Sequence, residues 1–457
     1  MSVVTSRGLL DVYRHGSMDN MEKQGGATLF QEKEQFMSKE EIRKVQLEMF
    51  RRQIKHAYDN VPFYRKKFDD AGIKPGDIKT LEDVAKVPFT VKDDLRDHYP
   101  YGIIAVPIEQ VNRMHASSGT TGIPTVVTYT KKDLDTWSNL MARCYSCAGV
   151  EPKDIVQNAY GYGLFTGGLG FHMGAERLGT MIIPTATGNT KRQIRMMKDM
   201  KSTVLCCTPS YALYLIEALK EENVDPSELS IRIGMFGAEP WSDETRKHIE
   251  KSLHIRAQDL YGMSELYGPG VAVECPEQNG LHIWADEFLV ETIDPDTGEV
   301  LLPGEKGEIV FTMLSREAMP LLRYRTKDLA VINWEKCACG RSHPRIMRIK
   351  GRSDDMLIVG GVNVFPSQIE DILVGIEELG EQFQIILETT KLDNLHVQVE
   401  VSPHFWGKVD LKELAGKVST RLQESLTLRA RIELLEPGTI PRTQGKAKRV
   451  IDNRKKI

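Results

Sequence analysis

A stretch rich in glycine and hydroxyl residues, HASSGTTG (residues 115–122), contains residue types that can bind a phosphate. Glycine lets consecutive backbone N–H groups point toward one anion, and the hydroxyls add further donors. The stretch does not match the GxxxxGK[ST] loop of nucleoside triphosphatases, because no lysine follows the second glycine. A tight hairpin turn before the strand-like TVVTYT (residues 125–130) explains the same residues. The phosphate hypothesis names Ser117, Ser118, Gly119, Thr120, Thr121 and Gly122.

Two carboxylates lie in segments that could hold a nucleotide. In YGMSELYGPG (residues 261–270), Tyr261 could stack on a base and Glu265 could bind a divalent metal. In RYRTKD (residues 323–328), Asp328 at a strand end could accept both ribose hydroxyls, because an ionised carboxylate has two acceptor oxygens. A Tyr–Gly turn with a solvated glutamate and a surface salt-bridge patch are the respective alternatives.

Basic residues follow in two later segments. GRSDD (residues 351–355) adds Arg352 and Asp354, and PRTQGKAKR (residues 441–449) places Lys446 next to a glycine. A solvated basic tail explains the second segment equally well. Taken one by one, these segments do not identify a function.

Three cysteines and a histidine have types and spacings that could hold zinc. Cys275 and His282 lie in VECPEQNGLH, and Cys337 and Cys339 lie in EKCACGRSHPR. A Cys₃His set is one of the closed tetrahedral forms of structural zinc, although C-x-C is tighter than the usual spacing. Buried free cysteines are the alternative, and His343 could replace His282.

The surrounding pattern predicts an α/β fold. MSKEEIRKVQLEMFRRQIKHAYDN (residues 37–60) reads as an amphipathic helix, begun by a capping box of Ser38 and Glu41. From about residue 80 to 335, short apolar runs alternate with charged helical stretches, which indicates parallel or mixed sheets covered by helices.

A composition shift at residues 351–373 predicts a second, α+β domain with a helix starting near Pro366. Within it we expect strands at 384–390, 395–402 and 431–437 and a helix at 411–426. The predicted divisions are a tail at 1–37, a large domain at 38–353 and a small mobile domain at 354–457. RHGSMDN (residues 14–20) could be a tag remnant before a natural start at Met18.

Composition excludes several classes of protein. A net charge of −4 over 457 residues argues against a nucleic-acid binder, which would carry a basic excess. No apolar run approaches the roughly 18 to 20 residues of a membrane-spanning helix. The N-terminus lacks the apolar core of a signal peptide, so we expect a cytoplasmic protein whose seven cysteines are not a disulfide framework.

The order of the motifs is more specific than any one of them. SSGTTG, YGMSE, RYRTKD, GRSDD and PRTQGK together resemble the adenylate-forming superfamily of acyl-CoA ligases and luciferase-like enzymes, over nearly the whole chain from about residue 38. VPFTVKDDLRDHYPYG, YGYGLFTGGLGFHMGAERLG, FGAEPWS and GKAKRVIDNR look like the phenylacetate–CoA ligase family. The resemblance implies a ligase that first forms an acyl-adenylate from ATP and then passes the acyl group to coenzyme A.

The resemblance also implies roles for the candidate residues. The 117–122 loop would order the β- and γ-phosphates, Glu265 would hold Mg²⁺, and Lys446 would approach the carboxylate and α-phosphate, with Lys448 as the second choice. The small domain would rotate about Asp354 and present the GGVNV face (residues 360–364) to coenzyme A. The remaining implied nucleotide-binding residues are Gly237, Ala238, Glu239, Tyr261, Gly262, Met263, Ser264, Asp328 and Arg352.

The acid-binding residues and the acceptor stay open at this stage. Aromatic residues in AYGYGLFTGG suggest a slot for a flat ring, and its expected lining is Tyr160, Tyr162, Phe165, Ala238 and Pro269. Ordinary core packing is the alternative for each. Phenylacetate is the first choice, with indoleacetate or another aryl acid behind it. An adenylating enzyme that serves a carrier protein, and a non-catalytic nucleotide-binding protein, are the competing functions; a homodimer is expected only from the resemblance.

Overall fold

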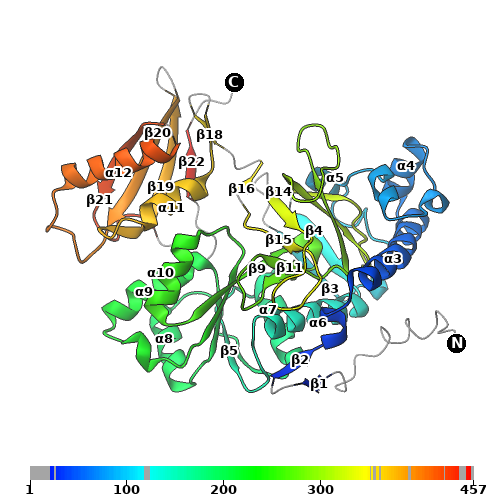
Figure 1. Ribbon diagram of the computed structural model, residues 1–457, viewed down its shortest axis with the longest axis horizontal. Helices are drawn as coiled ribbons and strands as arrows, with labels where there is room; N and C mark the ends of the chain where they lie inside the picture. The colour runs from blue at the N-terminus through cyan, green and yellow to red at the C-terminus, as the bar shows by residue number, and fades with distance from the viewer. Residues whose placement is uncertain are drawn as a thin grey trace.

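The structure is a computed structural model that describes residues 21–24, 27–117, 124–349, 351–353, 357–359, 362–389, 393–426, 428–441 and 449–453. These residues form a large α/β unit and a smaller α+β unit, coloured orange to red at the upper left of Figure 1. The predicted fold class is confirmed. No helix of the described ranges is both long and apolar enough to cross a bilayer.

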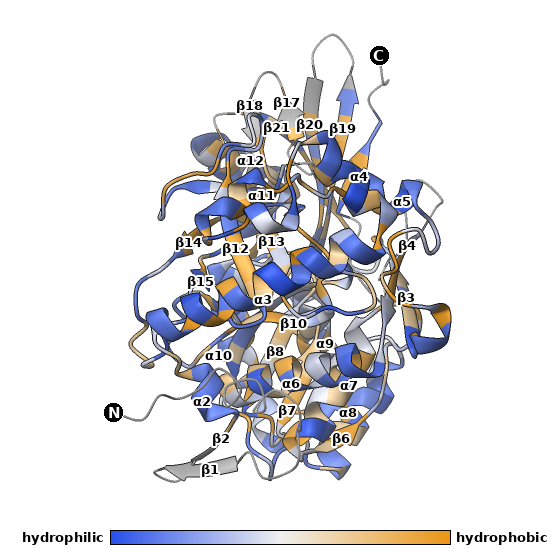
Figure 2. Cartoon of the chain, turned by 90° about the vertical axis from the view of Figure 1, so that its right-hand side faces the viewer, coloured by the Kyte–Doolittle hydropathy of each residue, from blue (hydrophilic) through white to orange (hydrophobic). Residues whose placement is uncertain are grey.

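The first long helix is the one predicted from its capping box. α3 (Lys39–Asn60) begins where Ser38 Oγ accepts from Glu41 N and Glu41 Oε2 accepts from Ser38 N. Its buried residues recur three or four positions apart, and its outer face is hydrophilic in Figure 2. The other N-terminal helices and strands are β1 (Met21–Gln24), β2 (Ala27–Phe30), α2 (Glu32–Gln35), α4 (Pro62–Asp70) and α5 (Lys92–Asp97).

A parallel sheet forms one half of the large unit. Its strands follow the order β6-β5-β7-β8-β9, all parallel. Because side chains alternate across a strand, Val204 and Cys206 pack with α6 and α7, whereas Leu205 and Cys207 pack with α8 to α10. The elements are α6 (Lys131–Cys147), β5 (Ile155–Asn158), α7 (Gly167–Leu178), β6 (Met181–Ile183), α8 (Thr190–Asp199), β7 (Val204–Cys207), α9 (Pro209–Glu221), β8 (Ile233–Gly237), α10 (Asp243–Leu253) and β9 (Arg256–Met263).

The sheet continues from β9 as an antiparallel half. Its order is β9-β10-β11-β15-β14-β13-β12, and β16 pairs with β14 beside this path. The mixed sheet predicted from the sequence is therefore present. Its strands and the separate β3–β4 pair are β3 (Arg113–Ser117), β4 (Thr125–Tyr129), β10 (Gly268–Glu274), β11 (Leu281–Ile283), β12 (Phe288–Ile293), β13 (Lys306–Met313), β14 (Tyr324–Asn333), β15 (Arg345–Ile346) and β16 (Gly351–Arg352).

The small unit has a hydrophobic core of its own, which begins at Leu357. Its sheet order is β21-β20-β19-β22, and α11 begins at Pro366 as predicted. The other strands and the helix expected in this part are also confirmed. The elements are β17 (Leu357–Val359), β18 (Val362–Val364), α11 (Pro366–Val374), β19 (Leu379–Thr389), β20 (Asp393–Val401), α12 (Leu411–Leu426), β21 (Ala430–Leu435) and β22 (Val450–Asp452).

Candidate functional site

Three predicted nucleotide residues from three separate motifs lie in contact. Tyr261 on β9 donates from its hydroxyl to Asp328 Oδ2 at 2.6 Å, and Arg352 Nη1 lies 3.3 Å from Asp328 Oδ1. Strand pairing enforces the second contact, because Asp328 on β14 is directly opposite Arg352 on β16. Burial and the neighbouring carboxylate raise the pKa of Tyr261 well above its usual range, so its hydroxyl stays protonated.

The sequence predicted Asp328 at a strand end. In the structure it lies within β14 instead. A bulge aims its side chain. The β13–β14 register shifts between Glu308 and Val310, and Lys327 adopts a left-handed φ of 67°. The extra residue at a bulge bends the strand and turns a side chain away from the ladder. Asp328 can therefore face Tyr261 although its strand continues on both sides.

The basic residues before Asp328 are not a surface salt-bridge patch, contrary to the alternative considered for RYRTKD. Arg323 is 3% exposed and donates from Nε and Nη2 to Glu291. Arg325 donates to Glu308 and to the Pro295 carbonyl. These guanidinium groups neutralise buried carboxylates of β12 and β13, so they position the strand that carries Asp328 and are not available to a ligand.

The predicted Gly237–Glu239 segment lies beside Tyr261. Gly237 ends β8 and pairs with Leu260 on β9, and a Cβ at Gly237 would be 2.2 Å from the Leu260 carbonyl oxygen. Ala238 has a left-handed φ of 74° and is exposed, and Glu239 Oε1 accepts from Ser210 N at 2.7 Å. The end of β8, where Gly237 must be a glycine, thus adjoins Tyr261 at the switch from parallel to antiparallel strands.

Glu265 is a buried carboxylate poorly supplied with partners. It follows the half-buried residues Gly262 and Met263, which end β9, and Ser264, which begins the next turn. Its Oε1 atom has no hydrogen-bond partner among the described residues, and Lys92 Nζ lies 3.5 Å away. Sequence reasoning did not single out Lys92, since a lysine in a charged helix start gives no signal by itself. A buried carboxylate oxygen without a hydrogen-bond partner can bind a metal ion, and the nearby Lys92 can bind the same anionic ligand as that metal.

A buried cation fixes the turn that carries Glu265. The Arg316 guanidinium carbon lies 3.9 Å and 4.5 Å from the ring centroids of Tyr129 and Tyr267. The Tyr129 hydroxyl donates to the Tyr267 carbonyl at 2.8 Å, next to the Ser264–Leu266 turn. The cation–π contacts of Arg316 and the hydrogen bond from Tyr129 therefore hold this turn in place.

The glycine-rich loop connects two paired strands. β3 and β4 are antiparallel with Ser117 opposite Thr125. The two strands that flank the loop therefore pair as the hairpin alternative predicted. Ser117 Oγ has no hydrogen-bond partner in the described part of the chain. Other predicted residues lie outside the described residues: Ser118, Gly119, Thr120, Thr121, Gly122, Asp354, Lys446 and Lys448.

The expected acid-binding residues differ in burial. Tyr160 is buried, stacks on Phe171 at 4.6 Å, and donates to the Cys207 carbonyl. Tyr162 is half-buried and accepts from Asn158 Nδ2 at 2.7 Å, whereas Phe165 is 54% exposed. Pro269 is buried, and its carbonyl accepts from the indole of Trp137. The exposed Phe165 ring can therefore contact a ligand, whereas the buried Tyr160 ring is already packed against protein.

The predicted metal-binding side chains also come together. Cys275, His282, Cys337 and Cys339 place their ligand atoms within 4.8 Å of one another. His343 does not belong to this group, because its Nδ1 accepts from Ala285 N and its Nε2 donates to the Glu34 carbonyl. Burial lowers the pKa of His343 to about 4, so it is neutral in these bonds.

Known families and relatives match this chain over most of its length. The AMP-binding enzyme family matches residues 55–313, and the AMP-binding enzyme C-terminal domain matches residues 361–454. The phenylacetate-coenzyme A ligase of Thermus thermophilus is 45% identical over 93% of this chain and 100% of the relative. The phenylacetate-coenzyme A ligase of Escherichia coli is 46% identical over 91% of this chain and 96% of the relative.

Crystal structures of a 2-hydroxyisobutyryl-CoA ligase, among them a postadenylation state and a thioesterification state, resemble the present structure. Its postadenylation state with 2-HIB-AMP gives a TM-score of 0.90 at 29% identity, covering 96% of this chain and 95% of that one. Its thioesterification state with 2-HIB-AMP and CoA gives 0.70 at 30% identity, covering 95% and 97%. The present structure is therefore more similar overall to the postadenylation state of that ligase than to its thioesterification state.

Proposed function

The chain belongs to the phenylacetate-coenzyme A ligase family of AMP-binding enzymes, and from this premise we propose that it joins an aryl acid, phenylacetate first, to coenzyme A. In the first half-reaction a carboxylate oxygen attacks the α-phosphorus of ATP, and pyrophosphate leaves. In the second, the thiol of coenzyme A attacks the acyl carbon, and AMP leaves with the carboxylate oxygen. The meeting of Tyr261, Asp328 and Arg352 is the observation that carries the proposal.

The nucleotide would lie over the end of β9. Asp328 accepts the ribose hydroxyls, Arg352 orients that carboxylate, and Tyr261 supports the adenine beside Gly237 to Glu239. The Ser117 to Gly122 loop donates to the β- and γ-phosphates. The partner-poor Glu265 Oε1 atom fits Mg²⁺, which would neutralise phosphate charge when bound. Lys92, 3.5 Å from Glu265, adds a second positive charge at that end of the nucleotide.

A rotation of the small unit would separate the half-reactions. We place the boundary at residues 353/354, because the core of the small unit begins at Leu357. The greater likeness to a postadenylation state supports an arrangement of the two units that precedes the rotation, and in the proposed mechanism Lys446 acts before that rotation. His248 on α10 lies 3.1 Å from Glu381 on β19, a contact between the units that rotation about Asp354 would break. The GGVNV segment would then face coenzyme A.

Asparagine in place of Asp328 is expected to weaken ATP binding by about 10- to 100-fold, since a charged hydrogen bond contributes roughly 1.5–3 kcal/mol. Steady-state kinetics should show a higher KM for ATP and a smaller change in kcat. The matched control is 2′-deoxy-ATP: the unmodified enzyme should discriminate against it, and Asp328→Asn should not. Equal discrimination by both proteins would remove Asp328 from the ribose site.

A panel of acids assayed for AMP release tests substrate and acceptor together. We expect arylacetates, with phenylacetate ahead of indoleacetate and of fatty acids, to release AMP with coenzyme A as the sole acceptor. Phe165 and Tyr162 supply the aromatic contact in this view. Adenylate that accumulates without thioester would favour a carrier protein as acceptor. No acid-dependent pyrophosphate exchange would favour a non-catalytic nucleotide-binding protein.

Three further proposals accompany the ligase activity. Besides ATP and Mg²⁺, the chain holds zinc at Cys275, His282, Cys337 and Cys339 in a structural role. It works in the cytoplasm. It forms a homodimer, an expectation that rests on family resemblance and that sedimentation would test.

A further inference from the structure

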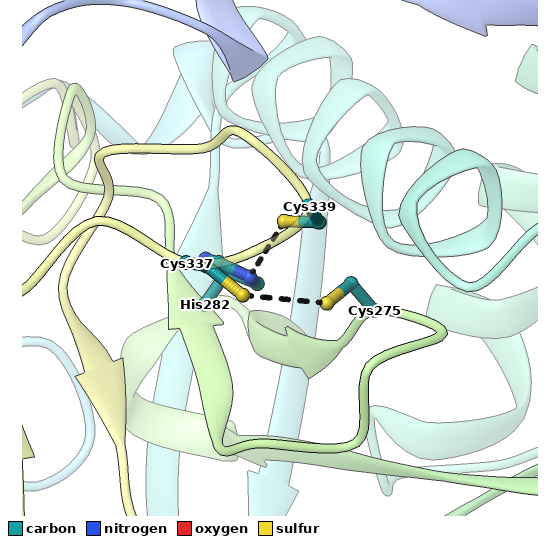
Figure 3. A group of neighbouring side chains, drawn as sticks. All are labelled: Cys275, His282, Cys337 and Cys339. Carbon is teal, nitrogen blue, oxygen red and sulfur yellow. Dashed lines mark hydrogen bonds between the residues drawn. The ribbon is translucent and has the colours of Figure 1, made fainter.

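A tight group of sulfur and nitrogen atoms lies beside β10 and β11 of the large sheet. Figure 3 shows the three thiols and the imidazole turned toward one another. Cys275, His282 and Cys337 are buried, and Cys339 is half-buried. Four such side chains from three separate segments can enclose one ion and exclude other ligands, which is how closed structural metal sites are built.

The distances within the group fit a tetrahedron around zinc. With Zn–S of about 2.3 Å and Zn–N of about 2.0–2.1 Å, tetrahedral geometry puts two sulfurs about 3.8 Å apart and a sulfur and nitrogen about 3.6 Å apart. Cys275 Sγ and Cys337 Sγ are 3.9 Å apart, and Cys339 Sγ and His282 Nε2 are 3.4 Å apart. A disulfide needs about 2.05 Å between sulfurs, so the cysteines are spaced for a shared ion and not for a bond.

Turns and strand pairing of the backbone hold the four ligand residues in place. Cys275 directly follows β10, and the turn after it closes with Gln278 N donating to the Cys275 carbonyl. His282 on β11 is opposite Val273 on β10 and Arg345 on β15. The loop with Cys337 and Cys339 turns through Gly340 at a left-handed φ of 92°. These turns preorganise the ligands, which reduces the entropic cost of binding an ion.

One arginine ties the two ligand loops together. Arg345 Nη1 donates to the Asn279 carbonyl at 2.6 Å, and its Nη2 donates to the Glu335 carbonyl at 3.4 Å. The first acceptor lies between Cys275 and His282, and the second lies just before Cys337. The group is therefore built by contacts independent of the metal, unlike a chance meeting of thiols in a core.

The loop of residues 336–343 also contacts α2 and the residue that follows it. Arg341 donates to Gln35 Oε1 at 2.6 Å, and its guanidinium carbon lies 4.7 Å from the Phe36 ring centroid. His343 Nε2 donates to the Glu34 carbonyl at 2.8 Å. Any ion that fixes Cys337 and Cys339 therefore also fixes α2 against the large unit.

We infer that Cys275, His282, Cys337 and Cys339 bind one structural Zn²⁺, which holds residues 336–343 as the platform for α2. Soft thiolates and an imidazole in a tetrahedral set select zinc over the hard cation expected at Glu265. The site contributes no group to the reaction. Its presence or absence is therefore a separate question from the ligase activity.

Metal analysis and X-ray absorption of tag-free protein test the site. We expect about one zinc per chain, with a shell of three sulfurs near 2.3 Å and one nitrogen near 2.0–2.1 Å. The double variant Cys337→Ser/Cys339→Ser should fall below about a tenth of an equivalent. Cys206→Ser, which changes a buried thiol outside the group, should keep its zinc.

Either of two results would overturn the inference: less than about a tenth of an equivalent after incubation with zinc, or a shell without sulfur. Because the unmodified protein is measured, a variant that fails to fold does not affect these outcomes.

Hydrogen exchange tests whether residues 336–343 form the platform for α2. On zinc removal, residues 29–36 and 336–343 should exchange at least about tenfold faster, while α12 stays unchanged. Unchanged exchange at 29–36 would contradict the anchoring role.

Discussion

Lys446→Ala is expected to lower the rate of acyl-adenylate formation by about 10³-fold or more. The rate of the thioester half-reaction should stay within a few-fold of that of the unmodified enzyme. The physical reason is where charge develops. The first transition state concentrates negative charge at the α-phosphate and the attacking carboxylate, and a lysine brought to that point stabilises it. In the proposed mechanism, the second step follows rotation of the small unit, which would withdraw this lysine. Pyrophosphate exchange measures the first half, and thioester formation from supplied phenylacetyl-adenylate measures the second.

Lys448→Ala is the matched control, since it removes the same charge two residues away. It should retain most of both half-reactions. If Lys446→Ala lowered both halves equally, the lysine would act in folding or in general nucleotide binding. If Lys448→Ala produced the selective loss instead, the reactive lysine would be the second one, and the proposed rotation would stand.

Glu265→Gln is expected to lower the rate of adenylation by at least about 100-fold, which corresponds to roughly 2.7 kcal/mol. The amide keeps the shape of the carboxylate, so the turn fixed by Tyr129, Tyr267 and Arg316 should survive. It removes the negative charge that would attract Mg²⁺ and that faces Lys92. A titration of the rate against Mg²⁺ should show half-saturation at a higher concentration than in the unmodified enzyme.

An exposed glutamate serves as the control for this charge change. Glu109→Gln, on the surface of the large unit, should leave the Mg²⁺ titration unaltered. An unchanged titration in Glu265→Gln would argue that Glu265 only balances Lys92. A loss of cooperative unfolding in Glu265→Gln would point to a structural role instead.

Local signals in the sequence predicted much of the fold. The capping box at Ser38 and Glu41 marks the start of α3, and the proline at residue 366 marks the start of α11. Both depend on residues within one helical turn, so no tertiary information is needed. The mixed character of the sheet followed from the alternation of apolar runs and charged helices. Its strand order did not, because pairing depends on contacts between distant segments.

The same distinction applies to the candidate site. The order of the motifs, through the family resemblance, pointed to Tyr261, Asp328 and Arg352, which the structure brings together. The bulge that turns Asp328 toward Tyr261 was not predictable, because Lys327 carries no signal for a left-handed backbone. The buried partners of Arg323 and Arg325, and the contact of Lys92 with Glu265, are likewise pairings across separate strands and helices. Spacing alone could not choose between His282 and His343; the hydrogen bonds of His343 decide it.

The fate of the carboxylate oxygens tests the central claim most directly. With phenylacetate labelled by ¹⁸O at both carboxylate oxygens, attack on the α-phosphorus followed by thiolysis at the acyl carbon leaves one label in AMP and one in the thioester carbonyl. Mass spectrometry of the AMP from a single turnover should therefore show one ¹⁸O atom. Unlabelled AMP, or label in inorganic phosphate, would contradict an acyl-adenylate mechanism.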